Sequence, residues 1–460
     1  MTTHPRNPRM LSVEQLRTRI DSGEVDTVLA VFTDMQGRLQ GKRLHAQYFL
    51  DEVLAHGTEG CNYLLAVDVD MNTVPGYAIS SWDTGYGDMV FDLDLDTIRL
   101  LPWLPGTAMV QCDLSGMDGA PVAVSPRTVL QRQVERVAAA GYTAFAGTEL
   151  EFIVFDDSYE SAWDSGYVGL TPANKYNVDY SVLGTSRVEP LLRDLRNGMF
   201  GAGMIVESAK GECTFGQHEV AFRYADVLST ADNHVVYKNG AKEIAARHGK
   251  SLTFMAKYDE REGNSCHIHL SLRGADGALV FVDGSGAGSH ESALYRQFVA
   301  GILATLREFT LLYAPNINSY KRFAAGSFAP TTVAWGRDNR TCAVRLVGHG
   351  AGSRLENRVP GGDVNPYLAI AGMLAGGMYG IEQELDLEDE LVGNAYDAVE
   401  RPHVPATLRD ARDLFRDSAV ARAAFGDDVV EHYAHAADIE IAAYDAVVTD
   451  WERRRGFERL

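Results

Sequence analysis

The segment Gly147-Thr-Glu-Leu-Glu-Phe-Ile-Val-Phe155 constrains the fold more than any other part of this sequence. It ends in the β-branched and aromatic residues that are typical of a buried strand, yet it contains two acids, Glu149 and Glu151. Residues two apart in a strand share a face and lie about 7 Å apart, so both carboxylates would point into the same space. Two divalent cations about 3.5 to 4 Å apart would suit such a pair, and the alternative is an ordinary solvated strand face.

Three later segments repeat this alternation of polar and apolar side chains, at residues 217–222, 267–272 and 354–358. Alternate residues in each segment share one strand face. These residues are Gln217 and Glu219 in the first segment, His267, His269 and Ser271 in the second, and Arg354, Glu356 and Arg358 in the third. Four strands from distant parts of the chain therefore present acids, imidazoles or guanidiniums on one face. The pattern predicts a curved sheet whose inner face lines a wet, charged cavity.

Local signals divide the chain into two domains. The capping box of Ser12 and Gln15 predicts a helix, which is followed by a strand, a turn, a return strand and a helix at residues 28–33, 34–37, 39–44 and 46–55. This order predicts a small α+β domain over residues 1–105, ended by Leu101-Pro-Trp-Leu-Pro105. Residues 106–460 would then form the second domain.

The second domain carries several helix signals. Ser125-Pro126 starts a helix that ends at Gly141, and a helix that is apolar nearly all round, and hence buried, follows Asn365-Pro366 to about Glu384. Further helices are predicted at residues 189–202, from Thr407 and near 438–452. The glycine-rich segment 284–289 lacks the lysine of a phosphate-binding loop, so we expect a plain loop there.

The composition excludes several functional classes. Sixty-three acids against 42 bases give a net charge of −21, which repels nucleic acid and anionic membranes. The first ten residues are polar and no run of 18 apolar residues occurs, so we expect a cytoplasmic protein without a membrane span. The five cysteines are scattered without CxxC spacing, which argues against a disulfide framework or a zinc finger.

Five motifs, in order, resemble those of glutamine synthetases across essentially the whole chain. They are Asp34-Met-Gln-Gly-Arg38, Gly147-Thr-Glu-Leu-Glu-Phe152, Gly216-Gln-His-Glu219, Asn318-Ser-Tyr-Lys-Arg322 and Asn365-Pro-Tyr-Leu368. More closely, the chain resembles the actinobacterial glutamine-synthetase-like enzymes that γ-glutamylate amines such as ethanolamine or polyamines. The resemblance implies an N-terminal β-grasp domain followed by a catalytic domain. It also implies a homo-oligomer, commonly a dodecamer of two hexameric rings, with active sites shared between neighbouring subunits.

The resemblance also implies roles for the acids and imidazoles. The implied ligands of one divalent ion are Glu151, Glu212 and Glu219, and those of a second ion are Glu149, His267 and Glu356. Oxygen ligands with one imidazole suit Mg²⁺ or Mn²⁺ better than zinc, and two or three such ions are expected. The positions that resemble the ATP site are Glu207, His269, Ser271 and Arg345.

Three arginines match positions that hold L-glutamate and the transferring phosphoryl group in the family: Arg322, Arg340 and Arg358. A guanidinium suits both tasks because it binds carboxylate or phosphate through two parallel hydrogen bonds. Gly263 matches a backbone contact to glutamate. In the implied reaction, glutamate attacks the γ-phosphate of ATP to give γ-glutamyl phosphate and ADP, and an amine then attacks the acyl phosphate.

The flap segment, which we define as residues 322–330, departs from the family pattern. Phe328 stands where glutamine synthetases carry a glutamate that helps to deprotonate ammonium. A phenyl ring cannot accept a proton, but it offers an apolar wall or a π face to an organic cation. The Asp-Gly-Ser-Ser element, which supplies a further ammonium-site acid in the family, is also missing, and Asp68–Gly76 has no clear counterpart. We therefore predict a small organic amine, ethanolamine or a polyamine, in place of ammonia.

Two alternatives stay open. One is an ordinary ammonia-using glutamine synthetase, against which Phe328 counts. The other is a catalytically inactive structural or regulatory relative, which would have no physical reason to keep six metal ligands and three arginines. Two further features are noted: Lys210 replaces a histidine that often precedes the metal-binding glutamate, and Asn394-Ala-Tyr396-Asp resembles the adenylylated segment of some bacterial glutamine synthetases. A tyrosine in an exposed loop is ordinary, so the second feature does not establish regulation.

Overall fold

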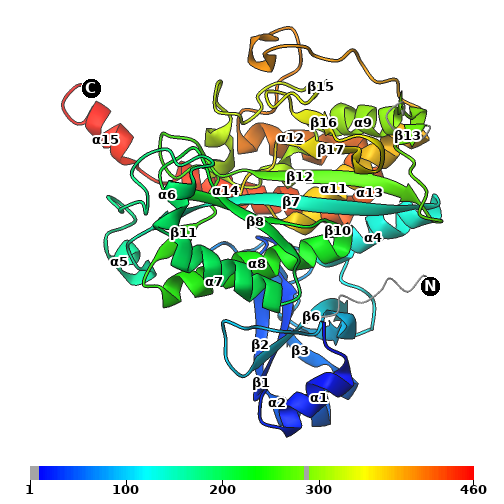
Figure 1. Ribbon diagram of the computed structural model, residues 1–460, viewed down its shortest axis with the longest axis vertical. Helices are drawn as coiled ribbons and strands as arrows, with labels where there is room; N and C mark the ends of the chain where they lie inside the picture. Colours follow the sequence, from blue (N-terminus) through cyan, green and yellow to red (C-terminus); the bar gives the residue numbers. More distant parts are fainter. Residues whose placement is uncertain (1–9, 284–289) are drawn as a thin grey trace.

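The computed structural model describes residues 10–283 and 290–460 (Figure 1). The loop expected at residues 284–289 lies outside this description, as do the first nine residues. Helices and strands are mixed in the described chain, which confirms the predicted α+β class. None of the helices in these two ranges has the length and apolarity needed to cross a membrane.

The N-terminal sheet lies in the lower part of Figure 1 and has the strand order β2-β1-β6-β4-β3, with β5 paired to β6. Strands β1 and β6 are parallel, whereas β1 with β2 and β4 with β6 are antiparallel. The strands are β1 (Thr27–Thr33), β2 (Leu39–His45), β3 (Thr58–Cys61), β4 (Asp88–Leu93), β5 (Arg99–Leu100) and β6 (Thr107–Gly116). The predicted hairpin is β1–β2, and the capping box of Ser12 and Gln15 begins α1 (Val13–Asp21). The helix expected at 46–55 is α2 (Ala46–Tyr48), a π-helical turn (Phe49–Val53) and α3 (Leu54–His56).

The position of strand β6 differs from what a domain division at residue 105 would suggest. It begins at Thr107 and pairs with β1 and β4, so it belongs to the N-terminal sheet. Few contacts should cross a boundary between domains. The division itself stays a prediction, and this pairing favours placing it after Gly116.

The larger sheet brings the predicted alternating strands together. Its order is β15-β16-β17-β12-β7-β9-β8, and β10 and β11 also pair with β7. Within the described chain its pairs are antiparallel except for β15 with β16. The strands are β7 (Tyr142–Phe155), β8 (Val206–Gly211), β9 (Gln217–Phe222), β10 (Ala225–Asp226), β11 (Ser251–Thr253), β12 (Cys266–Gly274), β15 (Trp335–Arg337), β16 (Val344–Val347) and β17 (Arg354–Asn357). This is the curved, largely antiparallel sheet expected from the sequence, and β13 (Val282–Asp283) with β14 (His290–Glu291) forms a separate pair.

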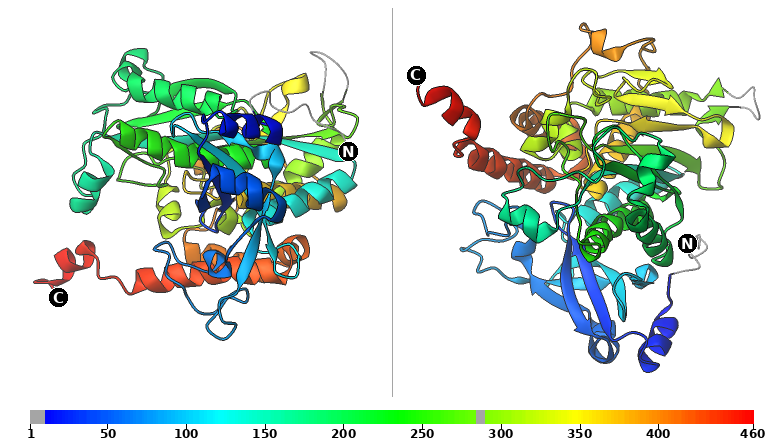
Figure 2. Two further views of the ribbon diagram at one scale, coloured as in Figure 1. Left: turned by 90° about the horizontal axis from the view of Figure 1, so that it is seen from below. Right: turned by 60° about the vertical axis from the view of Figure 1, so that its left-hand side comes forward.

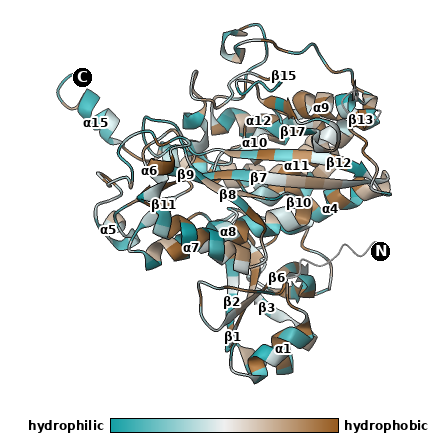
Figure 3. Cartoon of the chain, viewed as in Figure 1, coloured by the Kyte–Doolittle hydropathy of each residue, from teal (hydrophilic) through white to brown (hydrophobic). Residues whose placement is uncertain are grey.

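Helices cover the face of β7 that carries Leu150, Phe152 and Val154, and the opposite face carries Glu149 and Glu151. Helices α4 and α8 pack against β7, and α11 packs against α4, α8 and α9. The bounds are α4 (Pro126–Ala139), α7 (Glu189–Gly201), α8 (Val227–Arg247), α9 (Ala293–Thr305) and α11 (Pro366–Glu382). Helix α11 is buried on nearly every side, as its sequence predicts, and carries the brown of hydrophobic residues in Figure 3.

The C-terminal region is helical. Its helices are α12 (Leu408–Asp417), α13 (Ala419–Phe425), α14 (Asp427–Asp445) and α15 (Asp450–Gly456), and three short helices lie earlier, α5 (Tyr159–Asp164), α6 (Val182–Ser186) and α10 (Thr310–Tyr313). Thr407 caps α12 as expected. The continuous helix predicted near 438–452 is wrong, because Thr449 and Glu452 form a capping box that starts a new helix. That helix, α15, projects from the body of the molecule in both views of Figure 2.

A buried arginine joins the N-terminal sheet to the helices that cover the larger sheet. Arg127 of α4 binds Asp232 of α8 through two hydrogen bonds of 3.0 Å, and it binds Asp94 at 2.6 Å. Its guanidinium also pairs with Asp113 of β6. The hydroxyl of Tyr367 donates to Asp232 at 2.6 Å. Three carboxylates from separate elements therefore converge on one cation.

Replacing Arg127 by leucine is expected to destabilise the protein by about 3 to 5 kcal/mol, because removing one partner of a buried ion pair leaves charges buried without compensation. Urea denaturation followed by tryptophan fluorescence measures the change. The matched control is Arg136→Leu on the same helix, whose pair with Glu382 is part-exposed and contributes at most about 1 kcal/mol. Equal losses in both variants would contradict a special role for the buried pair.

Candidate active site

The strand register places the predicted metal-site residues side by side. In the sheet, Glu149 lies opposite His267 and Glu151 lies opposite Glu219. Likewise His269 on β12 lies opposite Glu356 on β17. Opposed residues in antiparallel strands have their side chains close together on one face. Residues more than 200 positions apart in the sequence therefore meet on the inner face of one sheet.

The first group of acids consists of Glu151, Glu212 and Glu219, whose carboxylate oxygens lie within 4.8 Å of one another. Glu151 accepts hydrogen bonds from the backbone N–H of Ser265 at 2.6 Å and from Nε2 of Gln217 at 3.0 Å. These bonds fix one oxygen of Glu151. This is the same set of three that the resemblance implies for one divalent ion.

The second group consists of Glu149, His269 and Glu356, with ligand atoms again within 4.8 Å. The resemblance implies His267 where this grouping has His269. Nδ1 of His267 lies 3.4 Å from Glu149 and 3.6 Å from Glu356, so both imidazoles border the same carboxylates. Nε2 of His267 is buried and has no hydrogen-bond partner within the described chain.

The carboxyl pKa is shifted in opposite directions in the two groups, upward for Glu219 and downward for Glu356. Burial and then the charge of Glu149 raise the pKa of Glu219 to about 8. Burial also acts to raise the pKa of Glu356, but His267 and Arg358 outweigh it and hold that pKa at about 2. Together the two groups hold five buried or partly buried carboxylates, which require positive charge among them.

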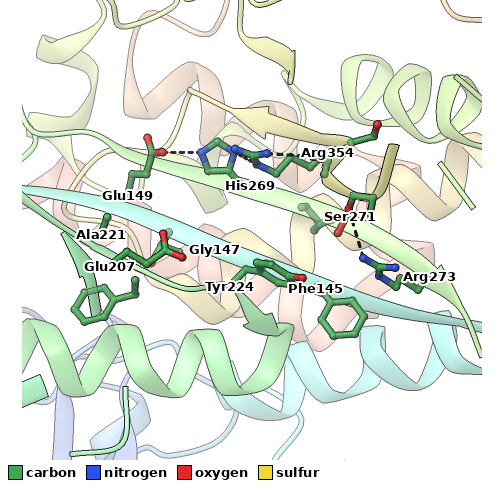
Figure 4. Close-up of a pocket in the computed structure, with 17 residues that line it drawn as sticks. Phe145, Gly147, Glu149, Glu207, Ala221, Tyr224, His269, Ser271, Arg273 and Arg354 are labelled. Carbon is green, nitrogen blue, oxygen red and sulfur yellow. Dashed lines mark hydrogen bonds and ion pairs between the residues drawn. The ribbon is translucent and has the colours of Figure 1, made fainter. Parts of the chain in front are cut away.

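A cavity of about 280 Å³ opens beside the second group and holds three of the four residues predicted for the nucleotide (Figure 4). These are Glu207, His269 and Ser271. Nε2 of His269 hydrogen-bonds Glu149 at 2.9 Å, and its Nδ1 accepts from Nε of Arg354 at 3.2 Å. The rings of Phe145 and Tyr224 form part of the wall.

Arg345, the fourth residue predicted for the nucleotide, lies in a neighbouring cavity of about 650 Å³ that shares Ser353 with the first. Nη1 of Arg345 donates to Glu356 at 2.8 Å, and its Nε donates to Asp338 at 3.1 Å. The structure therefore places Arg345 beside the second carboxylate group rather than in the cavity with Glu207.

The three arginines predicted for glutamate and phosphate differ in environment. Arg322 is buried and donates to Ser265 Oγ at 2.9 Å and to two backbone carbonyl oxygens, and burial lowers its pKa to about 10. Arg358 is also buried and pairs with Glu356. Arg340 has a side chain 55% exposed, and its backbone oxygen accepts from Arg358 at 3.1 Å. Arg340 therefore lies at the exposed rim of the site, where its backbone oxygen is hydrogen-bonded to Arg358.

Gly263 packs against Arg322, since a Cβ atom there would lie 3.3 Å from Cγ of Arg322, and Phe328 follows Arg322 in the flap segment. A Cβ atom at Gly263 would lie 2.0 Å from the carbonyl oxygen of Ala256, so only glycine fits there. The ring of Phe328 is 53% exposed, and its backbone φ of 56° is unusual for an aromatic residue. Backbone strain of this kind clusters at functional sites.

Sequence reasoning missed three contacts of the site. Lys210 pairs with Glu212 and lies 3.8 Å from Glu219, whereas the sequence shows only that it replaces a histidine. The alternation places Arg354 on the correct strand face but does not indicate its partner, His269. Gln217 shares the face of Glu219, and that alternation was the signal that could have assigned it to Glu151.

Residues 123–456 match the family described as glutamine synthetase, catalytic domain. The chain belongs to the glutamine synthetase family.

Two curated relatives are similar over nearly their whole length. Gamma-glutamylethanolamide synthetase GlnA4 of Streptomyces coelicolor is 64% identical over 450 residues, which cover 98% of this chain and 96% of the relative. Glutamate–isopropylamine ligase of a Pseudomonas species is 39% identical over 446 residues, covering 96% and 97%. Among solved structures, a GmaS/ADP complex matches with a TM-score of 0.84 at 28% identity, covering 96% of this chain and 99% of that chain.

Proposed function

We propose that the protein is an ATP-dependent ligase that joins the γ-carboxyl group of L-glutamate to a primary amine, with ethanolamine as the first candidate and a polyamine as the second. The observation that carries this proposal is the 64% identity, over nearly the whole chain, to a gamma-glutamylethanolamide synthetase. The relative named for isopropylamine also supports an organic amine. The products would be a γ-glutamyl amide, ADP and phosphate.

Two divalent ions, Mg²⁺ or Mn²⁺, would be held by the six predicted ligands. The donor set fits, because buried carboxylates with one imidazole need a hard cation among them. The first ion would be held by Glu151, Glu212 and Glu219, and the second by Glu149, His267 and Glu356. Bound metal would supply Lewis-acid stabilisation of charge on the transferred phosphoryl group.

The hydrogen bonds of the two histidines support His267 as the ligand over His269. A guanidinium only donates, so Arg354 requires Nδ1 of His269 to be an acceptor. The ring proton of neutral His269 then lies on Nε2 and is donated to Glu149, which leaves that nitrogen without a free lone pair. His267 has Nδ1 facing both carboxylates and is the better ligand.

The chain's own residues would orient the two reactants. Glu207, His269 and Ser271 line the cavity proposed for ATP, and the match to a GmaS/ADP complex supports a nucleotide there. Arg345 and Arg358 form ion pairs with Glu356 and would bring positive charge to the edge of the cavity proposed for ATP. Arg340 is exposed enough to close on the phosphoryl group and Arg322 would fix the glutamate end beside Gly263. The γ-carboxylate of glutamate would attack ATP, and the amine would then attack γ-glutamyl phosphate.

Phe328 would form the apolar side of the amine subsite. Its exposed ring can contact the methylene groups of an amine or face its cationic end. It cannot take a proton from ammonium, which disfavours ordinary glutamine synthesis. A small amine with a neutral tail needs only one polar partner, and this favours ethanolamine over a polyamine.

Phosphate release from ATP and glutamate, measured with a panel of amines, tests the proposed function. The panel contains ammonium, ethanolamine, short monoamines, putrescine, spermidine and spermine. We expect strong release with ethanolamine and little with ammonium. Release with ammonium alone would return the protein to glutamine synthesis, and no release with any amine would favour the inactive relative.

Replacing Lys210 by methionine is expected to tighten Mn²⁺ binding about tenfold, because it removes one positive charge a few ångströms from the proposed divalent ion. The ammonium group of Lys210 pairs with Glu212, a proposed ligand of that ion. Isothermal titration of chelator-treated protein without ATP or amine measures the affinity. Lys250→Met, which breaks a lysine–aspartate pair outside the group, is the control and should leave affinity unchanged. Weaker Mn²⁺ binding in Lys210→Met would contradict the idea that the lysine ammonium and the metal ion compete for Glu212.

The assembly stays a prediction, and we propose a homo-oligomer of two hexameric rings. The resemblance supports it, and so does the projecting helix α15. Trp451 in this helix and Phe457 just after it are 63% and 90% exposed, which is unusual for large apolar residues in a monomer.

A further inference from the structure

The loop at residues 391–397 has no role in the reaction described above, yet it connects two parts of the site. The hydroxyl of Tyr396 donates to the backbone oxygen of Ala329 at 2.9 Å, directly after Phe328 in the flap segment. The backbone N–H of Ala395 donates to Thr341 Oγ1 at 2.9 Å, directly after Arg340. One short loop therefore bonds to the neighbours of two proposed site residues.

Buried contacts and hydrogen bonds hold this loop in one conformation. Ala395 is fully buried, and its carbonyl oxygen accepts from Thr332 Oγ1 at 2.9 Å. The side chain of Asn394 caps the turn by accepting from the N–H of Tyr396 at 3.2 Å. Asn339 donates to the carbonyl oxygen of Gly393 at 2.8 Å. These hydrogen bonds hold the backbone around Tyr396 in place, so that Tyr396 can act as a fixed point for the flap segment.

The flap segment requires a restraint near Phe328, because the backbone there has an unfavourable conformation. An aromatic residue at a φ of 56° is strained and persists only where surrounding contacts hold it. The ring of Phe328 is half exposed, so the described contacts that can hold it act through the neighbouring backbone. Within the flap, Ser327 Oγ donates to the carbonyl oxygen of Ala324 at 2.6 Å. The bond from Tyr396 to Ala329 restrains the other side. Burial raises the pKa of the Tyr396 hydroxyl, so it stays a donor at neutral pH.

We propose that Tyr396 is a positioning residue for the amine subsite: its hydroxyl bond to Ala329 holds Phe328 in the strained conformation that presents the ring to the amine. This inference rests on the proposed function, because it assigns Phe328 to the amine. Tyr396 touches no reacting atom and acts only through the flap backbone. Loss of its hydroxyl should therefore loosen the flap and weaken amine binding, while the binding of glutamate and ATP is kept.

The test compares Tyr396→Phe with Tyr159→Phe. Tyr159 is the matched control, because its hydroxyl also donates to a backbone carbonyl oxygen, that of Leu252, at 3.0 Å. Hydrogen–deuterium exchange of residues 323–331 should be about fivefold faster in Tyr396→Phe, as expected for the loss of one part-buried hydrogen bond. The KM for ethanolamine should rise about fivefold, whereas kcat and the KM for glutamate should stay within about twofold of wild type. Thr341→Val, which removes the bond to Ala395, should shift both readouts in the same direction.

Unchanged exchange of the flap in Tyr396→Phe, or equal acceleration in Tyr159→Phe, would overturn the proposed contact. Faster exchange with an unchanged KM for the amine would overturn the positioning role. A proportional fall in kcat for every substrate would indicate general damage and would also overturn it. The exchange measurement needs no substrate, so it decides the flap contact even if wild-type protein uses no organic amine and the proposed function fails.

Discussion

Replacing Glu219 by alanine is expected to abolish amide formation with every amine, lowering phosphate release on the order of a thousandfold or more. Glu219 is only 5% exposed and faces Glu151 across the β7–β9 pair. It is one of three carboxylates proposed to hold the first divalent ion. Without it, charge on the transferring phosphoryl group would lose its main stabilisation, and this step precedes the choice of amine. Phosphate release with glutamate and ethanolamine measures the loss.

Two companion variants separate charge from volume. Glu219→Gln keeps the shape and should lose nearly as much activity as Glu219→Ala, because the negative charge is what holds the cation. Glu382→Ala removes an exposed acid from α11 and should leave turnover unchanged. Both active-site variants should bind Mn²⁺ more weakly by isothermal titration. Normal activity in Glu219→Ala, or in Glu151→Ala, would remove the two-metal assignment.

Local physics predicted much of the fold. Alternation of polar and apolar residues located β7, β12 and β17, and capping chemistry located α1 and α12 at Ser12 and Thr407. These signals lie within a few residues of the element they predict. The helix predicted across residues 446–449 failed for a local reason too, because Thr449 reads as an interior residue until its capping box with Glu452 is recognised.

The grouping of the carboxylates could not be predicted in the same way. The alternation places Glu149 and Glu151 on one face, but their meeting with Glu219 and His267 depends on pairing between distant strands. Only the resemblance to a family supplied the grouping of these ligands in advance. The contacts of Lys210 and Arg354 depend on side-chain geometry, and the reach of β6 into the N-terminal sheet depends on non-local pairing. None of these three leaves a periodic signal in the sequence.

Replacing Phe328 by glutamate is expected to move the preference toward ammonium, raising the ratio of kcat/KM for ammonium to that for ethanolamine about a hundredfold. This is the lower end of what a positioned general base contributes. The flap ring would be exchanged for a carboxylate that attracts ammonium and can take its proton, and the apolar contact to the amine would be lost. The change adds little backbone strain, because the native residue is already a bulky one at a φ of 56°.

The control for this switch is Phe328→Gln, which has nearly the shape of glutamate but no charge and cannot act as a base. It should lower use of ethanolamine as much as Phe328→Glu does, because both lose the ring, and it should gain nothing with ammonium. Amine-dependent phosphate release, measured over a range of concentrations for each amine, gives both ratios. If Phe328→Glu behaves like Phe328→Gln, the flap residue alone does not decide between ammonia and organic amines. The missing acid, for which Asp68–Gly76 offers no clear counterpart, or the shape of the subsite would then carry the discrimination, because one carboxylate at the flap cannot by itself desolvate and hold a small, strongly hydrated cation.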